Sequence, residues 1–150
     1  MKKKILYFDM DNVLVDFPSG INALDAKTTQ EYKDRYDEVP HIFGKMLPLP
    51  GAIEAFTELS ELFDSYILST SPWDNETAPG DKLRWVKKYL QPNAYKRLIL
   101  SHHKNLNIGD FLIDDRIKNG AGEFTGEHIH FGTDQFPDWQ TVVEYLKQRA

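Results

Sequence analysis

The chain contains no cysteine among its 150 residues. Disulfide bonds, thiolate nucleophiles and cysteine-ligated zinc or iron–sulfur sites are therefore excluded, and any bound metal must be held by oxygen or imidazole ligands. Long apolar runs are also missing, because the apolar stretch after the basic residues 2–4 spans only residues 5–8 and ends at Asp9. Such a stretch is too short for the hydrophobic region of a signal peptide or for a membrane span. We therefore expect a soluble, cytoplasmic protein with no membrane partner.

The sequence also lacks an excess of positive charge. Its 18 Lys and Arg residues are outnumbered by 23 Asp and Glu residues, so the formal net charge is −5 and the pI is near 5.5. This balance leaves no general basic surface for polymeric nucleic acid, and a small anionic ligand requires local cations of its own. Hydrophobic residues make up 41% of the chain, which is enough for the core of one compact domain.

Five short apolar runs are predicted to be strands, at residues 5–8, 66–68, 98–100, 111–113 and 128–131. Apolar residues recur at helical spacing in three further stretches, at residues 52–63, 82–90 and 137–149. Strands that alternate with helices and are apolar enough to be buried on both faces predict an α/β fold with a mainly parallel five-stranded sheet. In open sheets of this kind, ligands bind outside the carboxyl ends of the strands.

Residues 17–49 interrupt this alternation, because they separate the first strand from the first long helix. The segment is too small to form a core of its own. We predict that it is a small helical cap inserted after the first strand and packed over the strand ends. The core of the single domain would then be formed by residues 1–16 and 50–150.

Polar side chains follow four of the predicted strands. They are Asp9 and Asp11 after the first strand, Thr70 and Ser71 after the second, Lys104 after the third, and Asp114, Asp115 and Arg116 after the fourth. Taken singly, such residues often cap the helix that follows a strand. If the four carboxylates converge, however, charges about 4 Å apart repel by about 4 kcal/mol at an effective dielectric near 20. The cluster then requires protonation or a cation, and oxygen ligands with few protein donors suit Mg²⁺.

A magnesium ion at this place indicates phosphoryl transfer. Asp9, directly at the strand end, can attack phosphorus and form an aspartyl-phosphate. Asp11 can protonate the leaving alkoxide and then activate water, and a neighbouring carboxylate can supply the raised pKa that this role needs.

The other polar residues at the strand ends can bind the phosphoryl group and the metal. Thr70 and Ser71 can donate hydrogen bonds to phosphoryl oxygens, and Lys104 can neutralise charge in the transition state. Either Asp115 or Asp114 can hold the metal ion.

These motifs together resemble those of the haloacid dehalogenase-like phosphatase superfamily. More narrowly, DMDNVLVDF, PLPGAIEAF, STSPW and FLIDDR, with Lys104 between the last two, are similar to segments of the 5′(3′)-deoxyribonucleotidase group. The resemblance covers essentially the whole chain. It implies a Rossmann-like three-layer sandwich and a Mg²⁺-dependent phosphatase that hydrolyses nucleoside monophosphates through an aspartyl-phosphate intermediate.

The resemblance also implies roles for individual residues. Magnesium would be held by the Asp9 side chain, the Asp11 main-chain carbonyl and Asp115, with Asp114 supporting Lys104. Phosphate would contact Thr70 and Lys104. The base pocket would involve Phe17, Arg116 and aromatic residues of the cap such as Phe43. The cap departs from the family pattern, because it is short and its bulky residues are only His41, Ile42, Phe43 and Met46.

Three other functions are alternatives. The same chemistry could act on another small phosphate ester, such as a sugar phosphate. Only the cap would distinguish these two substrate classes. A phospho-accepting signalling module also combines acidic residues, a Thr and a Lys around Mg²⁺, but in such modules the Lys comes last, whereas Lys104 precedes Asp114. A binding protein without activity is disfavoured because every motif position is filled.

Overall fold

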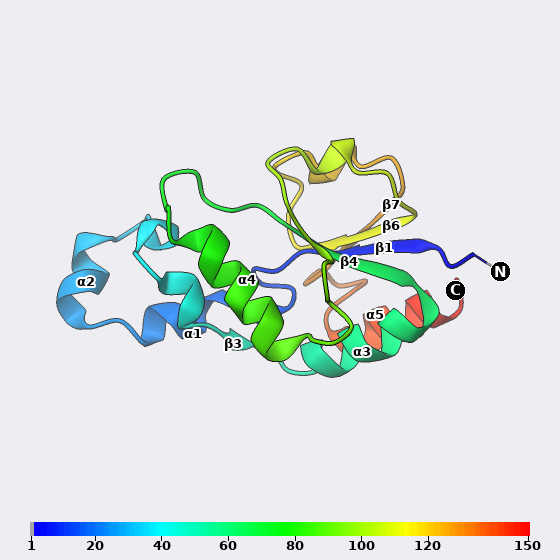
Figure 1. Cartoon of the computed structure of the whole chain (residues 1–150), viewed down its shortest axis with the longest axis horizontal. Helices are drawn as coiled ribbons and strands as arrows, with labels where there is room; N and C mark the ends of the chain where they lie inside the picture. Colours follow the sequence, from blue (N-terminus) through cyan, green and yellow to red (C-terminus); the bar gives the residue numbers. More distant parts are fainter. Residues whose placement is uncertain (1) are drawn as a thin grey trace.

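The computed structural model describes residues 2–150, and its centre is a five-stranded sheet with the order β5-β4-β1-β6-β7 (Figure 1). The strands are β1 (Ile5–Phe8), β4 (Asp64–Ser69), β5 (Leu98–Leu100), β6 (Phe111–Asp114) and β7 (Glu127–His130). Every neighbouring pair in this sheet is parallel. The predicted α/β fold with its parallel sheet is therefore confirmed, and the strand ends shift by only one or two residues.

The main core lies on one face of the sheet, beneath α3 (Ala52–Leu62) and α5 (Trp139–Lys147), which pack side by side (Figure 1). Side chains alternate along a strand, so Leu6 and Phe8 of β1 point into this core while Tyr7 points to the opposite face. Phe8 packs against Phe56 of α3, with ring centroids 4.9 Å apart. This packing holds the carboxyl end of β1 in place.

The opposite face of the sheet is covered by two short 3₁₀ helices, η3 (Lys104–Leu106) and η4 (Ala121–Glu123), and the loops around them. Tyr7, Leu112 and Phe124 form a second, smaller apolar cluster there. This layer of the sandwich is consequently thinner than the layer of α-helices.

Two helix boundaries differ from the prediction for reasons of capping. α4 (Ala78–Tyr89) begins before residue 82, because Pro79 lies in its first turn, where a missing N–H costs no hydrogen bond. α5 begins after residue 137, because the Asp138 side chain accepts a hydrogen bond from Thr141 N at 2.9 Å and caps the helix.

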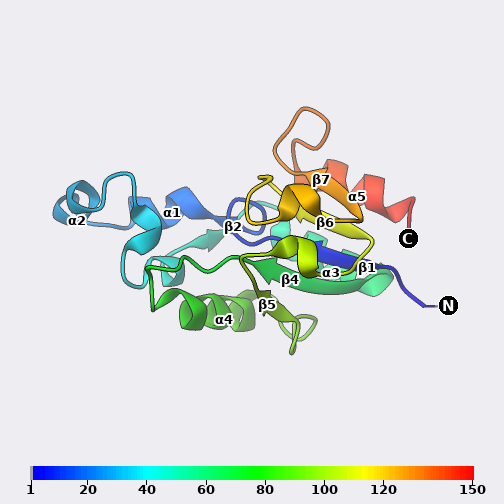
Figure 2. The ribbon, with the colours of Figure 1, turned by 90° about the horizontal axis from the view of Figure 1, so that it is seen from above.

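Most of the predicted cap of residues 17–49 extends beyond the carboxyl ends of the strands (Figure 2), and we call residues 17–46, which precede β3, the cap segment. It contains α1 (Phe17–Asn22), α2 (Ala26–Glu31), η1 (Tyr36–Glu38) and η2 (Ile42–Gly44). A two-stranded antiparallel sheet that the sequence analysis did not anticipate, β2 (Val15–Asp16) with β3 (Leu47–Pro48), joins its two ends.

The cap segment is also bound to α4 and to the loop before it. Asn75 Nδ2 donates to Val39 O at 3.0 Å, and Trp85 Nε1 donates to Met46 O at 3.1 Å. α4 thus packs between β5 and the cap segment and holds the cap over the strand ends. Across residues 2–150, no helix has both the length and the apolar character that a membrane span needs.

Candidate active site

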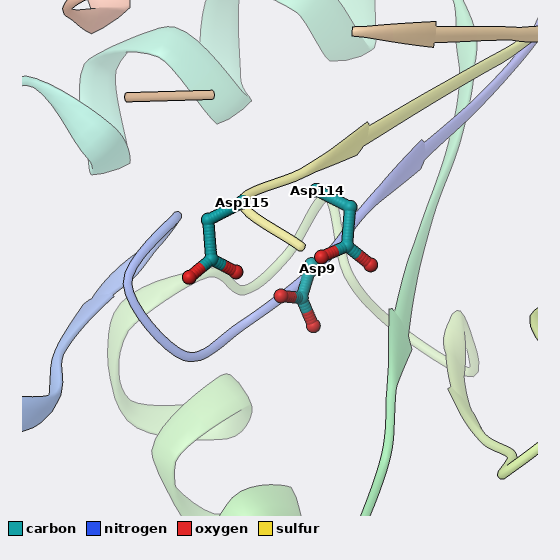
Figure 3. Close-up of side chains that lie close together, drawn as sticks. All are labelled: Asp9, Asp114 and Asp115. Carbon is teal, nitrogen blue, oxygen red and sulfur yellow. The ribbon is translucent and has the colours of Figure 1, made fainter. Parts of the chain in front are cut away.

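Three carboxylates meet at the carboxyl ends of β1 and β6 (Figure 3). Asp9 follows β1 directly, Asp114 is the last residue of β6, and Asp115 comes next. One oxygen of each carboxylate lies within 4.8 Å of the others. The parallel register, in which Phe8 pairs with Ile113, explains why residues about a hundred positions apart come together.

Lys104 lies within this cluster and is buried. Its Nζ donates hydrogen bonds to Asp9 Oδ1 at 2.9 Å and to Asp114 Oδ2 at 2.7 Å. Asp114 Oδ1 accepts a further bond from the backbone N–H of Arg116 at 3.0 Å. Both oxygens of Asp114 are therefore engaged, whereas Asp115 Oδ1 is buried and has no hydrogen-bond partner within residues 2–150.

Full ionisation of the three carboxyl groups is unfavourable. Burial, followed by repulsion from Asp9, raises the pKa of Asp115 to about 7 and that of Asp114 to about 6. Burial lowers the pKa of Lys104, but attraction to Asp9 and Asp114 more than compensates, so the net pKa is raised. The site therefore combines a firmly charged ammonium with carboxyl groups that favour an additional cation.

Asp11 lies on the tight turn that follows Asp9. The turn is closed by a hydrogen bond from Asn12 N to Val15 O at 2.7 Å, and Asn12 adopts a left-handed conformation with φ of 61°. Burial raises the pKa of the Asp11 carboxyl, Lys82 opposes this shift, and Asp9 adds a smaller increase. The expectation of a raised pKa holds, but burial is its main cause rather than the neighbouring carboxylate.

Lys82 of α4 is a member of the site that the sequence analysis did not select. Its side chain is fully buried, and its Nζ donates to Asp11 Oδ2 at 3.2 Å and to Ser69 Oγ at 2.7 Å. The same nitrogen lies 4.5 Å from the centroid of the Phe43 ring. A second buried ammonium thus contacts the end of β4, the cap and Asp11.

A sequence signal for Lys82 was present. Ala78, Trp85 and Val86 are buried on one face of α4, and Lys82 lies four residues after the first and three before the second. That spacing places a lysine on the apolar face of a helix, where burial demands a partner.

A cavity of about 630 Å³ opens between the cap segment and the strand ends. Four predicted site residues line it: Asp11, Phe17, Thr70 and Arg116. Residues that the sequence analysis did not place in the site complete its wall, among them Asp34, Tyr36, Asp37, Trp73 and His102. Trp73 is 85% exposed and meets His102 edge-to-face. Tyr36 and Asp37 belong to η1, and the other three residues lie on loops that reach the cavity.

Three of the predicted contact residues do not line this cavity, namely Phe43, Ser71 and Lys104. Phe43 does not line the cavity, because it is buried behind Phe17, with ring centroids 6.0 Å apart. Ser71 is also buried outside the cavity wall, and its hydroxyl has no hydrogen-bond partner within residues 2–150. Thr70 does line it, but its hydroxyl donates to Ser101 O at 2.8 Å, so its oxygen rather than its proton is available to a ligand.

Comparison with known proteins identifies the family. The model of the family "5′ nucleotidase, deoxy (Pyrimidine), cytosolic type C protein" matches residues 28–140. A provisionally named 5′(3′)-deoxyribonucleotidase of Vibrio phage KVP40 is 64% identical over 144 residues, covering 96% of this chain and 85% of that protein. The human cytosolic 5′(3′)-deoxyribonucleotidase is 29% identical over 82% of this chain and 77% of its own.

Solved structures agree on the fold. The provisionally named HAD-hydrolase YfnB from Bacillus subtilis, determined with bound magnesium, superposes with a TM-score of 0.59 at 13% identity. The match covers 92% of this chain and 90% of that one. The chain therefore belongs to the 5′(3′)-deoxyribonucleotidase family of haloacid dehalogenase-like hydrolases, a family of phosphoric monoester hydrolases.

Proposed function

We propose that this protein hydrolyses the phosphate of deoxyribonucleoside monophosphates through a Mg²⁺-dependent aspartyl-phosphate mechanism. The observation that carries the proposal is the convergence of Asp9, Asp115 and buried Lys104 beside a cavity with aromatic walls. The names of the similar proteins support the same substrate class.

The residues present fit a divalent cation. Asp115 Oδ1 is buried without a hydrogen-bond partner among the described residues, as expected of an atom available for a metal. Asp9 and Asp115 would hold the ion with their side chains, and Asp11 with its main-chain carbonyl. Within residues 2–150, four carboxylates in the site are opposed by two buried lysines and by Arg116, which leaves negative charge for Mg²⁺ to neutralise. When bound, the ion would supply charge neutralisation at the phosphoryl group.

The side chains of the chain itself would perform the covalent chemistry. Asp9 attacks phosphorus, forming an acyl-phosphate while the ester P–O bond breaks. Asp11 gives its proton to the leaving oxygen and later takes one from the water that hydrolyses the acyl-phosphate. Lys104, fixed by Asp114, keeps Asp9 oriented and neutralises developing charge on the phosphoryl oxygens.

The substrate class is tested by comparing deoxyribonucleoside 5′- and 3′-monophosphates with deoxyribose 5-phosphate, which lacks only the base. Stacking of a base on an aromatic side chain contributes about 1–3 kcal/mol. We therefore expect kcat/KM for at least one nucleotide to exceed that for the sugar phosphate by about 10- to 100-fold. Phe17→Leu, which keeps an apolar side chain but removes the ring, should reduce this ratio. Equal kcat/KM values would favour a sugar phosphatase instead.

The pKa of Asp115 leads to a prediction about stability. A carboxyl group whose pKa is raised from 3.8 to about 7 binds its proton more tightly in the folded state. Its contribution to the free energy of unfolding is complete below about pH 4 and is lost as the pH rises through about 7. In EDTA, the melting temperature of the wild type should therefore fall relative to that of Asp115→Asn across this pH range.

Magnesium should reverse this loss in the wild type. A ligand at about 100 times its Kd adds about 2.7 kcal/mol to the free energy of unfolding. The resulting rise in melting temperature should be largest above neutral pH, where the carboxylates are ionised, and smaller in Asp115→Asn. Parallel melting curves for the two proteins, with and without Mg²⁺, would show that Asp115 neither titrates abnormally nor holds the ion.

A further inference from the structure

The ammonium of Lys82 occupies a costly position that the chemistry described above does not use. The Lys82 side chain is 0% exposed, and transferring an ammonium out of water costs several kcal/mol unless partners compensate. Its partners are the carboxylate of Asp11, the hydroxyl of Ser69 and the ring face of Phe43. None of the hydrogen bonds within residues 2–150 joins Lys82 to Asp9 or to the carboxylates of β6.

Two elements besides the Asp11 turn contact the Lys82 ammonium. Ser69 is the last residue of β4 and is fully buried. Phe43 lies in η2, which packs against α4, the helix that carries Lys82. Asp11, in contrast, lies on the turn after β1 and is partly exposed. Lys82 is therefore the more deeply buried member of the Lys82–Asp11 pair, and its ammonium has further partners in β4 and in the cap.

The two oxygens of Asp11 are in different situations. Oδ2 accepts the hydrogen bond from Lys82, whereas Oδ1 is buried and has no partner within the described chain. Asp11 also lines the cavity. A carboxyl group that transfers protons must lie within hydrogen-bond reach of the reacting oxygen, and a misplacement of about 1 Å can lower a rate by about 10²-fold.

We propose that Lys82 is a positioning residue: by holding Asp11 Oδ2 beside Ser69 and the cap, it fixes the Asp11 carboxyl at the wall of the cavity, where this group exchanges protons with the leaving group and with water. This inference rests on the proposed function. Lys82 acts through Asp11 and transfers no proton itself. Because Phe43 is one of its supports, the cap contributes to the placement of the acid as well as to the wall of the cavity.

Measuring the two half-reactions separately distinguishes a positioning role of Lys82 from a purely structural one. In the first, the Asp9–phosphorus bond forms, the ester P–O bond breaks, and the proton of Asp11 passes to the leaving oxygen. A deoxynucleoside alkoxide needs that proton, whereas p-nitrophenolate leaves without it. In the second, water attacks phosphorus, its proton passes to Asp11, and the Asp9–phosphorus bond breaks.

The experiment measures both steps in Lys82→Met, which keeps an unbranched apolar side chain but removes the ammonium. We expect the single-turnover cleavage of a deoxynucleoside monophosphate to fall by about 10- to 100-fold. The first-turnover release of p-nitrophenolate from p-nitrophenyl phosphate should stay within about threefold of wild type, while later turnovers slow with the nucleotide reaction. Equal losses for the two esters, or no loss for either, would overturn the proposal.

Three variants serve as controls. Lys87→Met carries the same substitution at an exposed position of the same helix and should behave as wild type. Lys82→Arg should recover part of the nucleotide rate, because it keeps the charge. If Lys82→Met does not fold, Ser69→Ala removes one support of the ammonium without touching Asp11, and it should produce the same difference between the two esters at smaller size.

A crystal structure of Lys82→Met, or of Ser69→Ala if the former does not fold, decides the structural claim independently of activity. We expect the Asp11 carboxylate to leave its present position or to adopt several conformers, with Asp9 and Lys104 unmoved. An unchanged Asp11 would overturn the role of Lys82 even in an active enzyme. A wild type that cleaves neither ester would contradict the proposed function, and the crystal structure would still test the placement of Asp11.

Discussion

Asp9→Asn is expected to lower turnover of a deoxyribonucleoside monophosphate by about 10⁴-fold or more, the size of loss seen when a nucleophile is removed. The substitution keeps the shape of the side chain, but an amide cannot form the acyl-phosphate. Lys104 retains Asp114 as a hydrogen-bond partner, and repulsion within the acidic cluster falls. The melting temperature without metal should therefore be equal to that of wild type or higher, which separates lost chemistry from lost structure.

Two measurements check this expectation. Steady-state phosphate release reports turnover, and acid quenching with labelled substrate reports the covalent phosphoenzyme, which should disappear. Asp138→Asn is a matched control, because it places the same substitution at the exposed N-cap of α5, where Asn caps about as well as Asp. Turnover of Asp9→Asn within about tenfold of wild type would rule out the covalent route.

Asp11→Asn is expected to produce the second-largest loss, about 10²- to 10⁴-fold in turnover, the usual contribution of a general acid–base group. Both half-reactions should slow with a nucleotide, because each moves a proton through this carboxyl. With p-nitrophenyl phosphate only the second step needs it. The variant should therefore release p-nitrophenolate in a burst of about one equivalent per enzyme and then accumulate phosphoenzyme.

The same substitution changes the surroundings of Lys82. An Asn oxygen can still accept its hydrogen bond, but the charge of the buried ammonium is no longer balanced, so the melting temperature should fall below that of wild type. A burst without phosphoenzyme accumulation, or turnover equal to wild type, would show that another group carries the proton. Normal rates in Asp11→Asn would also contradict the role proposed for Lys82.

The placement of the acid by the fold explains how a small protein assembles this site. The carboxyl ends of β1 and β6 supply carboxylates from the same edge of the sheet, because parallel neighbours end together. α4 then contributes twice: Trp85 holds the cap through Met46 O, and Lys82 holds Asp11 through Oδ2. One helix thus ties the wall of the cavity to the residue that handles the proton.

The sequence by itself determined the α/β fold and the meeting of Asp9 with residues 114–115. Apolar, β-branched runs that alternate with helical spacing leave a parallel sheet as the simplest way to bury both faces. Once the strands are parallel, polar residues that directly follow them must gather at one edge. These conclusions depend only on periodicity and on position relative to a strand end, and both are local properties of the chain.

Only the tertiary structure decided which groups engage one another within the site. Asp114 and Asp115 are adjacent residues of the same type, yet Asp114 has both oxygens bound by Lys104 and the Arg116 backbone, while Asp115 keeps one oxygen without a partner among residues 2–150. Lys82 and Phe43 likewise acquire their places from how α4 and the cap pack together. Such contacts depend on the orientation of whole elements that are distant in the chain. Since that orientation is set by the packed core, it cannot be inferred from local sequence spacing.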